Sequence, residues 1–125
     1  MQLDDIISEL QRLKSEQDPS SGTDPNDIAR WRDRIDGIDQ LLLLLLNERS
    51  RSANNIGHIK KHLKLPIYVP EREKHVLKNV LDANDGPLND EAVRHLFERI
   101  IDETRSLERQ RYQNPTEDKK SDKDS

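Results

Sequence analysis

One stretch decides the fold of this chain, from Asp27 to Leu63: DIARWRDRIDGIDQLLLLLLNERSRSANNIGHIKKHL. It contains no proline, and Gly37 and Gly57 are its only residues whose backbone favours the helix poorly. Positions along it that alternate by three and four form a heptad seam, which predicts one long helix with a packing surface throughout. The seam consists of Ile28, Trp31, Ile35, Ile38, Leu42, Leu45, Arg49, Ser52, Ile56, Ile59 and Leu63.

The rest of the chain is also predicted to be helical, with turn residues between the helices. We expect a short amphipathic helix over 1–17, a linker over 18–26, a helical domain over 27–112 and a disordered tail over 113–125. Within the domain, the long helix is expected to start at a cap on Asn26 or Asp27 and to run to about 63. A second helix is predicted from Pro70 to about 83, and a third from a cap on Asn89 to about 112.

The length of the first of these three helices predicts a dimer. At 1.5 Å per residue, a helix over 27–64 is about 57 Å long, whereas a compact chain of about 100 residues has a radius of gyration of about 13 Å. The two shorter helices can cover only part of its seam. We therefore predict an all-α, three-helix subunit with one very long helix, in an intertwined homodimer, plus the short extra N-terminal helix.

The composition agrees with a chain that needs a partner. Of 125 residues, 31% are hydrophobic and 37% are charged, so a monomer would bury little apolar surface. The net charge of −4 argues against general nucleic-acid binding. The absence of cysteine excludes disulfides, thiolate nucleophiles and cysteine-based metal sites.

The same features predict a location in the cytoplasm. The acidic start Met1-Gln2-Leu3-Asp4-Asp5 lacks the features of an export signal. The longest apolar run, 41–46, is far shorter than the roughly 20 residues that span a membrane.

Arg49 occupies a seam position where the heptad pattern calls for an apolar residue. A guanidinium at such a position indicates an anion beside it. Lys60, eleven residues on, lies on nearly the same face about 16 Å along the axis, and between them Ala53 and Gly57 leave a hollow that predicts a pocket floor. The alternative is that Arg49 pairs with a buried acid such as Glu73 and that Lys60 is a solvated surface lysine.

Polar residues also replace apolar ones on the other two helices. The stripe of the third helix begins apolar and ends with Thr104 and Glu108, and in the second helix Glu73 precedes the inward-facing apolar positions. A hydroxyl that bonds back to the preceding turn, or an acid solvated near a helix end, would explain each residue alone. Their coincidence favours a site.

Several stretches in order resemble the all-helical class of chorismate mutase, and together they cover about residues 31–108. They are WRDRIDGID over 31–39, LLNER over 45–49, IGHIK over 56–60, PIYVPERE over 66–73, NDGPL over 84–88 and LFERII over 96–101. The resemblance implies an intertwined dimer with two equivalent active sites, each completed by an arginine of the other chain. It also implies an enzyme of phenylalanine and tyrosine biosynthesis that rearranges chorismate to prephenate without cofactor or metal.

The family pattern also implies a role for each matching residue. Arg49, and Arg32 from the partner subunit, would bind the two substrate carboxylates, while Lys60 reaches a carboxylate and the ether oxygen. Glu108 would donate to the ether oxygen, which makes Lys60, Glu108 and Arg49 the predicted catalytic residues. The remaining predicted substrate-binding residues are Arg72, which supports the charge balance, Glu73, which accepts from the substrate hydroxyl, and Thr104, where the family often has serine. Val69 departs from the pattern, because several members carry an aspartate there.

Other interpretations remain open at this stage. Isochorismate-pyruvate lyase shares the scaffold and breaks the same ether bond without joining the fragments. A non-catalytic module that binds chorismate or prephenate, and a purely structural helical dimer, are further alternatives. A metal site at His58 and His62, one helical turn apart, lacks an evident third ligand. The first helix could dock on its own dimer, recruit another pathway enzyme or have no role.

Overall fold

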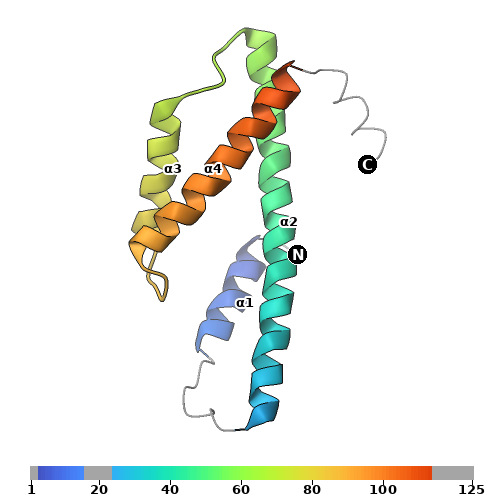
Figure 1. Cartoon of the computed structure of the whole chain (residues 1–125), viewed down its shortest axis with the longest axis vertical. Coiled ribbons are helices and arrows are strands. Elements are labelled where there is room, and N and C mark those ends of the chain that lie inside the picture. The colour runs from blue at the N-terminus through green and yellow to red at the C-terminus, as the bar shows by residue number, and fades with distance from the viewer. Residues whose placement is uncertain (1–2, 16–23, 114–125) are drawn as a thin grey trace, which may run out of the picture. The chain divides into compact units, whose positions relative to one another are not determined.

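The computed structural model describes residues 3–15 and 24–113, and every regular element within them is a helix (Figure 1). The helices are α1 (Leu3–Ser15), α2 (Pro25–Leu63), α3 (Pro70–Ala83) and α4 (Asp90–Gln113). The predicted all-α class with one very long helix is therefore confirmed. The predicted linker falls mostly, and the predicted tail almost entirely, outside the described residues.

The start of α2 lies slightly earlier than predicted. The helix begins at Pro25, and the cap is Asp24, whose Oδ1 accepts a hydrogen bond of 2.9 Å from the backbone N–H of Asn26. The Asp24 carbonyl accepts a second bond, of 2.9 Å, from the N–H of Asp27. The predicted cap on Asn26 or Asp27 was wrong because proline is favoured in the first turn, where its missing N–H costs nothing.

The other helix ends follow the sequence signals closely. The α3 helix starts at Pro70 and ends at Ala83, as predicted. Asn89 caps α4, since its Oδ1 accepts from the backbone N–H of Ala92 at 2.8 Å. Between these helices Gly86 has a φ of +84°, a conformation in which a side chain would be strained.

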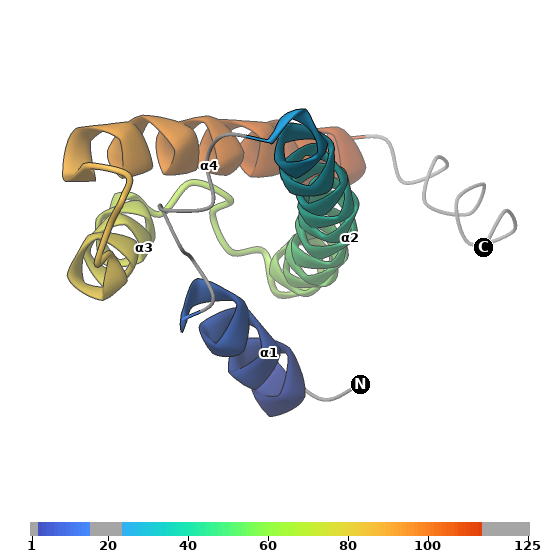
Figure 2. The same ribbon diagram turned by 90° about the horizontal axis from the view of Figure 1, so that it is seen from below.

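Two compact units make up the chain, Met1–Leu43 and Leu44–Ser125, and the boundary between them falls within α2. In the second unit α3 packs beside α4 (Figures 1 and 2). The buried apolar side chains of that unit are few and come from α2 and α4: Ala53, Val93 and Ile101. None of the helices described is both long and apolar enough to cross a membrane.

Most of the heptad seam of α2 is exposed in the single chain. The large apolar side chains that remain open to solvent include Ile28, Ile35, Ile38, Leu42, Leu45, Ile56, Ile59 and Leu63. Such a row is unusual for a chain that functions alone, because exposed apolar residues in a monomer are normally scattered. The seam therefore retains a surface that a partner chain could cover.

Candidate active site

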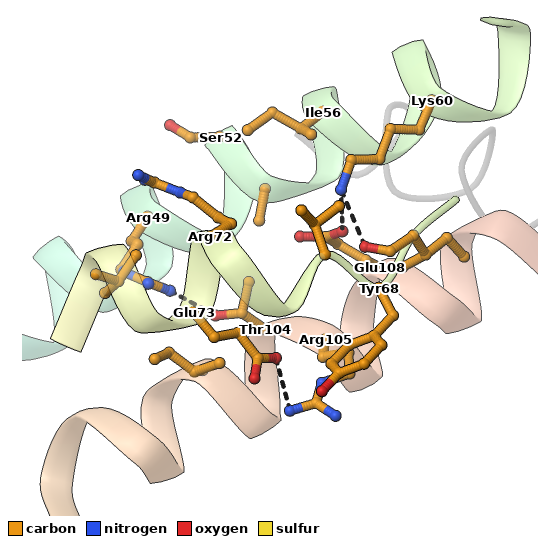
Figure 3. A pocket seen from close by; sticks show the side chains of 15 residues that line it. Arg49, Ser52, Ile56, Lys60, Tyr68, Arg72, Glu73, Thr104, Arg105 and Glu108 are labelled. Carbon is orange, nitrogen blue, oxygen red and sulfur yellow. Dashed lines mark hydrogen bonds and ion pairs between the residues drawn. The ribbon is translucent and has the colours of Figure 1, made fainter. Parts of the chain in front are cut away.

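The second unit contains a half-open cavity of about 410 Å³. Its walls come from the C-terminal half of α2, the connection after it, α3 and α4 (Figure 3). Six of the seven predicted site residues line this one cavity: Arg49, Lys60, Arg72, Glu73, Thr104 and Glu108. Positions more than 50 residues apart in the sequence are thus brought together by the packing of three helices.

Arg49 joins α2 to α4 across the cavity. Its Nη1 donates a hydrogen bond of 2.6 Å to Oγ1 of Thr104, and the Thr104 hydroxyl in turn donates to the carbonyl of Ile100 at 2.8 Å. The Thr104 hydroxyl therefore bonds back to the preceding turn, as predicted for a threonine without a functional role. Its oxygen nevertheless also accepts a hydrogen bond from Arg49. In the described part of the chain, no carboxylate forms an ion pair with Arg49, so the alternative pairing with Glu73 was wrong.

Lys60 and Glu108 meet at the other end of the cavity. The Lys60 ammonium donates to the carbonyl of Ile67 at 3.0 Å and lies 3.9 Å from Oε2 of Glu108. Their side chains are only 20% and 13% exposed, so Lys60 is not the solvated surface lysine of the alternative interpretation. The Lys60 ammonium has three N–H donors, so it can bond to a further acceptor in the cavity besides the Ile67 carbonyl.

Burial raises the pKa of Glu108 above its ordinary value, even though Lys60 and Arg49 favour its ionised form. A raised pKa favours the carboxylic acid, which can donate its proton in a hydrogen bond. An ionised carboxylate can only accept. Glu108 can therefore donate to an acceptor in the cavity whenever its carboxyl group is protonated.

The two small residues between Arg49 and Lys60 have different roles. Ala53 is buried and lines the cavity, as predicted for a pocket floor. Gly57 is buried but faces Glu108, and a Cβ added there would lie 3.9 Å from both Cβ and Cγ of that residue. The stem of Glu108 therefore packs against α2 at Gly57, at a distance that would be ordinary van der Waals contact for an added Cβ.

Sequence reasoning missed Arg105 and Tyr68, which also line the cavity. The guanidinium of Arg105 pairs with Glu73 at 2.7 Å and lies over the ring of Tyr68, 4.9 Å from its centroid. Helical spacing could have found the arginine, because it lies four residues after the buried Ile101 and three before Glu108. Tyr68 lies in the irregular connection before α3, where periodicity gives no signal.

The remaining predicted binding residues, Arg72 and Arg32, differ in position. Arg72 extends from α3 along the cavity (Figure 3), and its guanidinium makes no hydrogen bond or ion pair within the described residues. Arg32 belongs to the first unit, is exposed and does not line the cavity.

The metal alternative gains no support from the placement of the side chains. Across 3–15 and 24–113, no group of three or more His, Asp or Glu side chains is arranged to hold a metal ion. His58 and His62 are both exposed.

The charges of the cavity favour a small anion. Four basic side chains and two acidic ones line it, which leaves an excess of two positive charges when all are ionised. Apolar side chains form much of the remaining wall, among them Ile56, Val76 and Ile101. The site can therefore hold a compact dianion with an apolar body, and Lys60 and Glu108 can donate to a further oxygen of it.

Comparison with known proteins connects this geometry to a family. The family model for chorismate mutase type II matches residues 31–109. The chain is 40% identical over 87 residues to the bifunctional chorismate mutase/prephenate dehydratase of Aquifex aeolicus, covering 66% of this chain and 24% of that protein. It is 32% identical over 84 residues to the chorismate mutase of Methanocaldococcus jannaschii, covering 66% of this chain and 85% of that protein.

A solved structure shows the same similarity. Chorismate mutase (Form II) of Thermus thermophilus matches with a TM-score of 0.65 and 36% identity, over 66% of this chain and 94% of that one. By contrast, this chain spans only about a quarter of the bifunctional relative from Aquifex aeolicus.

Proposed function

The chain belongs to the chorismate mutase type II family, and we propose that it catalyses the rearrangement of chorismate to prephenate in phenylalanine and tyrosine biosynthesis. The resemblance predicted over 31–108 is confirmed by the family match over 31–109. The proposed activity is the first of the two named for the bifunctional relatives.

The excess of positive charge in the cavity is the observation that carries the proposal. Chorismate has two carboxylates, and the positive charges of the lining exceed the negative ones by two when Glu108 is ionised and by three when it is protonated. Arg49 and Arg72 have no carboxylate partner among the described residues, so their charges are available to an incoming anion. Planar guanidinium groups bind carboxylates through paired hydrogen bonds, which orient the ligand as well as hold it.

The reaction requires shape and polarity rather than a nucleophile. The carbon–oxygen ether bond of chorismate breaks while a carbon–carbon bond forms within the same molecule, and no proton is transferred. We assign Arg49 to one carboxylate, with Arg72 supporting the charge balance, so that the flexible enolpyruvyl group is held over the ring. Such orientation lowers the entropic part of the barrier.

The negative charge that develops at the ether oxygen gives a role to Lys60 and Glu108 at the other end of the cavity. As the carbon–oxygen bond breaks, negative charge grows on that oxygen. We assign Lys60 and protonated Glu108 as the two donors aimed at it, in agreement with their separation of 3.9 Å and their low exposure. One donor of this kind contributes about 3–4 kcal/mol in comparable sites.

We further propose a homodimer in the cytoplasm with shared active sites. The exposed seam of α2 supplies an apolar surface for a second copy. We assign Arg32, which lies in the first unit, to the site of the partner subunit. Relatives named for both chorismate mutase and prephenate dehydratase support a pathway enzyme as a further partner.

The test is to follow purified protein with chorismate and, separately, with isochorismate, and to identify the products. Prephenate formed from chorismate supports the proposal. Pyruvate released from isochorismate, with chorismate left unchanged, would indicate the lyase instead. Binding of chorismate without turnover would indicate a regulatory module, and Arg49→Ala serves in each assay as the control with a damaged site.

A further inference from the structure

Arg105 makes a different set of contacts from the other basic residues of the cavity. Its guanidinium pairs with Glu73 of α3 at 2.7 Å and with Asp102 of its own helix at 3.1 Å (Figure 3 shows the first pair). The ring of Tyr68 covers it, with its centroid 4.9 Å from Cζ. Three neighbours from three segments therefore restrain its position, and two of them neutralise its charge.

Glu73 is the other half of this arrangement. Its Oε1 contacts Arg105, and a carboxylate has further acceptor capacity, so Glu73 can take a second hydrogen bond from the cavity. Of the groups on chorismate, two are carboxylates, one is an ether oxygen and one is a hydroxyl. The hydroxyl is the substrate's only donor when both carboxylates are ionised, so it is the only group that can donate to Glu73.

A carboxylate in the wall of this cavity also has a cost. An unpaired Glu73 would repel both carboxylates of the substrate, whereas a Glu73 paired with Arg105 presents little net charge. The position where several family members carry an aspartate is Val69 here, so Glu73 is the acid available on this side.

We propose that Arg105 is a positioning residue, which holds the Glu73 carboxylate toward the substrate hydroxyl and offsets its charge against the dianion. This inference rests on the proposed function, because it assigns the hydroxyl of chorismate to Glu73. Arg105 acts through Glu73 and does not itself bind the substrate carboxylates.

The first experiment compares chorismate with an analogue that lacks the hydroxyl. In Arg105→Leu, the ratio of kcat/KM for chorismate to kcat/KM for the analogue should fall at least fivefold, and Glu73→Ala should lower it similarly. Arg105→Lys, which keeps the charge but not the planar fork, should fall between Arg105→Leu and wild type. A merely structural arginine would reduce both kcat/KM values by the same factor and leave the ratio unchanged, which would overturn the proposal.

The matched control is Arg99→Leu on the same helix. Arg99 pairs with Glu103 at the surface, where the two side chains are 77% and 64% exposed, and it does not line the cavity. Its substitution should leave both kinetic constants unchanged. Circular dichroism of each variant reports whether the helices are retained.

The second experiment tests the offset of charge. Arg105→Leu should raise KM for chorismate at least tenfold, and adding Glu73→Gln should bring KM down again, because the unpaired carboxylate is then gone. A double variant with KM no lower than that of Arg105→Leu would mean that Arg105 binds substrate directly, and would overturn the inference.

The wild-type assay separates this inference from the proposed function. Wild-type protein that does not turn chorismate over would refute the function, and the inference with it. Turnover by wild type with unchanged KM and unchanged ratio in Arg105→Leu would refute the inference alone.

Discussion

Glu108→Gln provides the most direct test of how the site stabilises the breaking bond. The side chain of Glu108 is 13% exposed, and its burial raises its pKa. Only the protonated acid can donate to the ether oxygen, while the ionised form would repel the charge that develops there. Glutamine has nearly the same shape and keeps an N–H donor, but it carries no titrating proton.

The size of the effect follows from two limits. Above the pKa of Glu108 in the substrate complex, the protonated fraction falls about tenfold for each pH unit. Loss of one such donor costs about 100- to 1,000-fold in kcat, and Lys60 still reaches the same region, since it lies 3.9 Å from Glu108. The alkaline limb of wild type should therefore fall over about two to three pH units and then level off.

The assay is kcat for chorismate at saturating substrate across the pH range, because kcat reports titration in the bound enzyme. Glu108→Gln should remove the alkaline fall. Circular dichroism at each pH excludes unfolding as its cause. If wild type and variant show the same alkaline limb, Glu108 is not the titrating donor, and Lys60 alone would have to stabilise the oxygen.

Four further outcomes are expected. Because burial raises the pKa of Glu108 in the folded protein, the folded state holds this proton more tightly than the unfolded state. The free energy of unfolding of wild type should therefore be highest at acid pH and fall as pH rises from about 4 through the folded pKa. Urea titrations of Glu108→Gln should show a smaller fall over that range. Gly57→Ala should raise the free energy of unfolding by about 0.5–1 kcal/mol, since the added Cβ meets Glu108 only at 3.9 Å; destabilisation would mean that the helices pack more closely. Arg49→Ala should lower kcat/KM at least 100-fold while urea unfolding changes by about 1 kcal/mol or less, the cost of its bond to Thr104; parallel loss of stability and activity would indicate a structural arginine. Light scattering should give a dimer at micromolar concentration, and a compact species of 14.6 kDa would contradict the shared site.

The sequence predicted the helices well because their signals are local. Pro70 marks a helix start because it has no N–H to leave unbonded, and Asn89 does so because its side chain accepts a bond from a free backbone N–H. The structure begins α3 at Pro70 and α4 directly after Asn89. Arg49 and Lys60 could be assigned to one face because helical geometry fixes the angle between positions eleven apart. The cavity itself depended on how three helices pack, which spacing within one helix does not determine.

The partners of individual charges could not be predicted for the same reason. The sequence suggested Arg49 as a possible partner of Glu73, and Arg105 was not considered. In the structure Glu73 pairs with Arg105, and the ring of Tyr68 lies against the same guanidinium. Likewise, Gly57 was predicted to form the cavity floor, but the packing of α4 puts Glu108 against it instead.

The contrast between Arg49 and Arg105 explains how one cavity can hold both a binding group and a supporting group of the same residue type. Arg105 has two acids beside it, so an incoming carboxylate would gain little from its charge and would have to displace Glu73. Arg49 has a neutral hydroxyl as its partner, and breaking or sharing that bond costs about 1 kcal/mol, which a charged bidentate contact exceeds. A substrate carboxylate is therefore expected at Arg49.

That preference depends on the neutralisation of Arg105 by its acidic neighbours. Glu73→Gln alone should therefore make part of the charge of Arg105 available to the substrate and lower KM. It should also reduce kcat, because the carboxylate that accepts from the substrate hydroxyl is lost. An increase in KM in that variant would show that Glu73 contributes binding energy in the ground state, and that the charges of the site are balanced in another way.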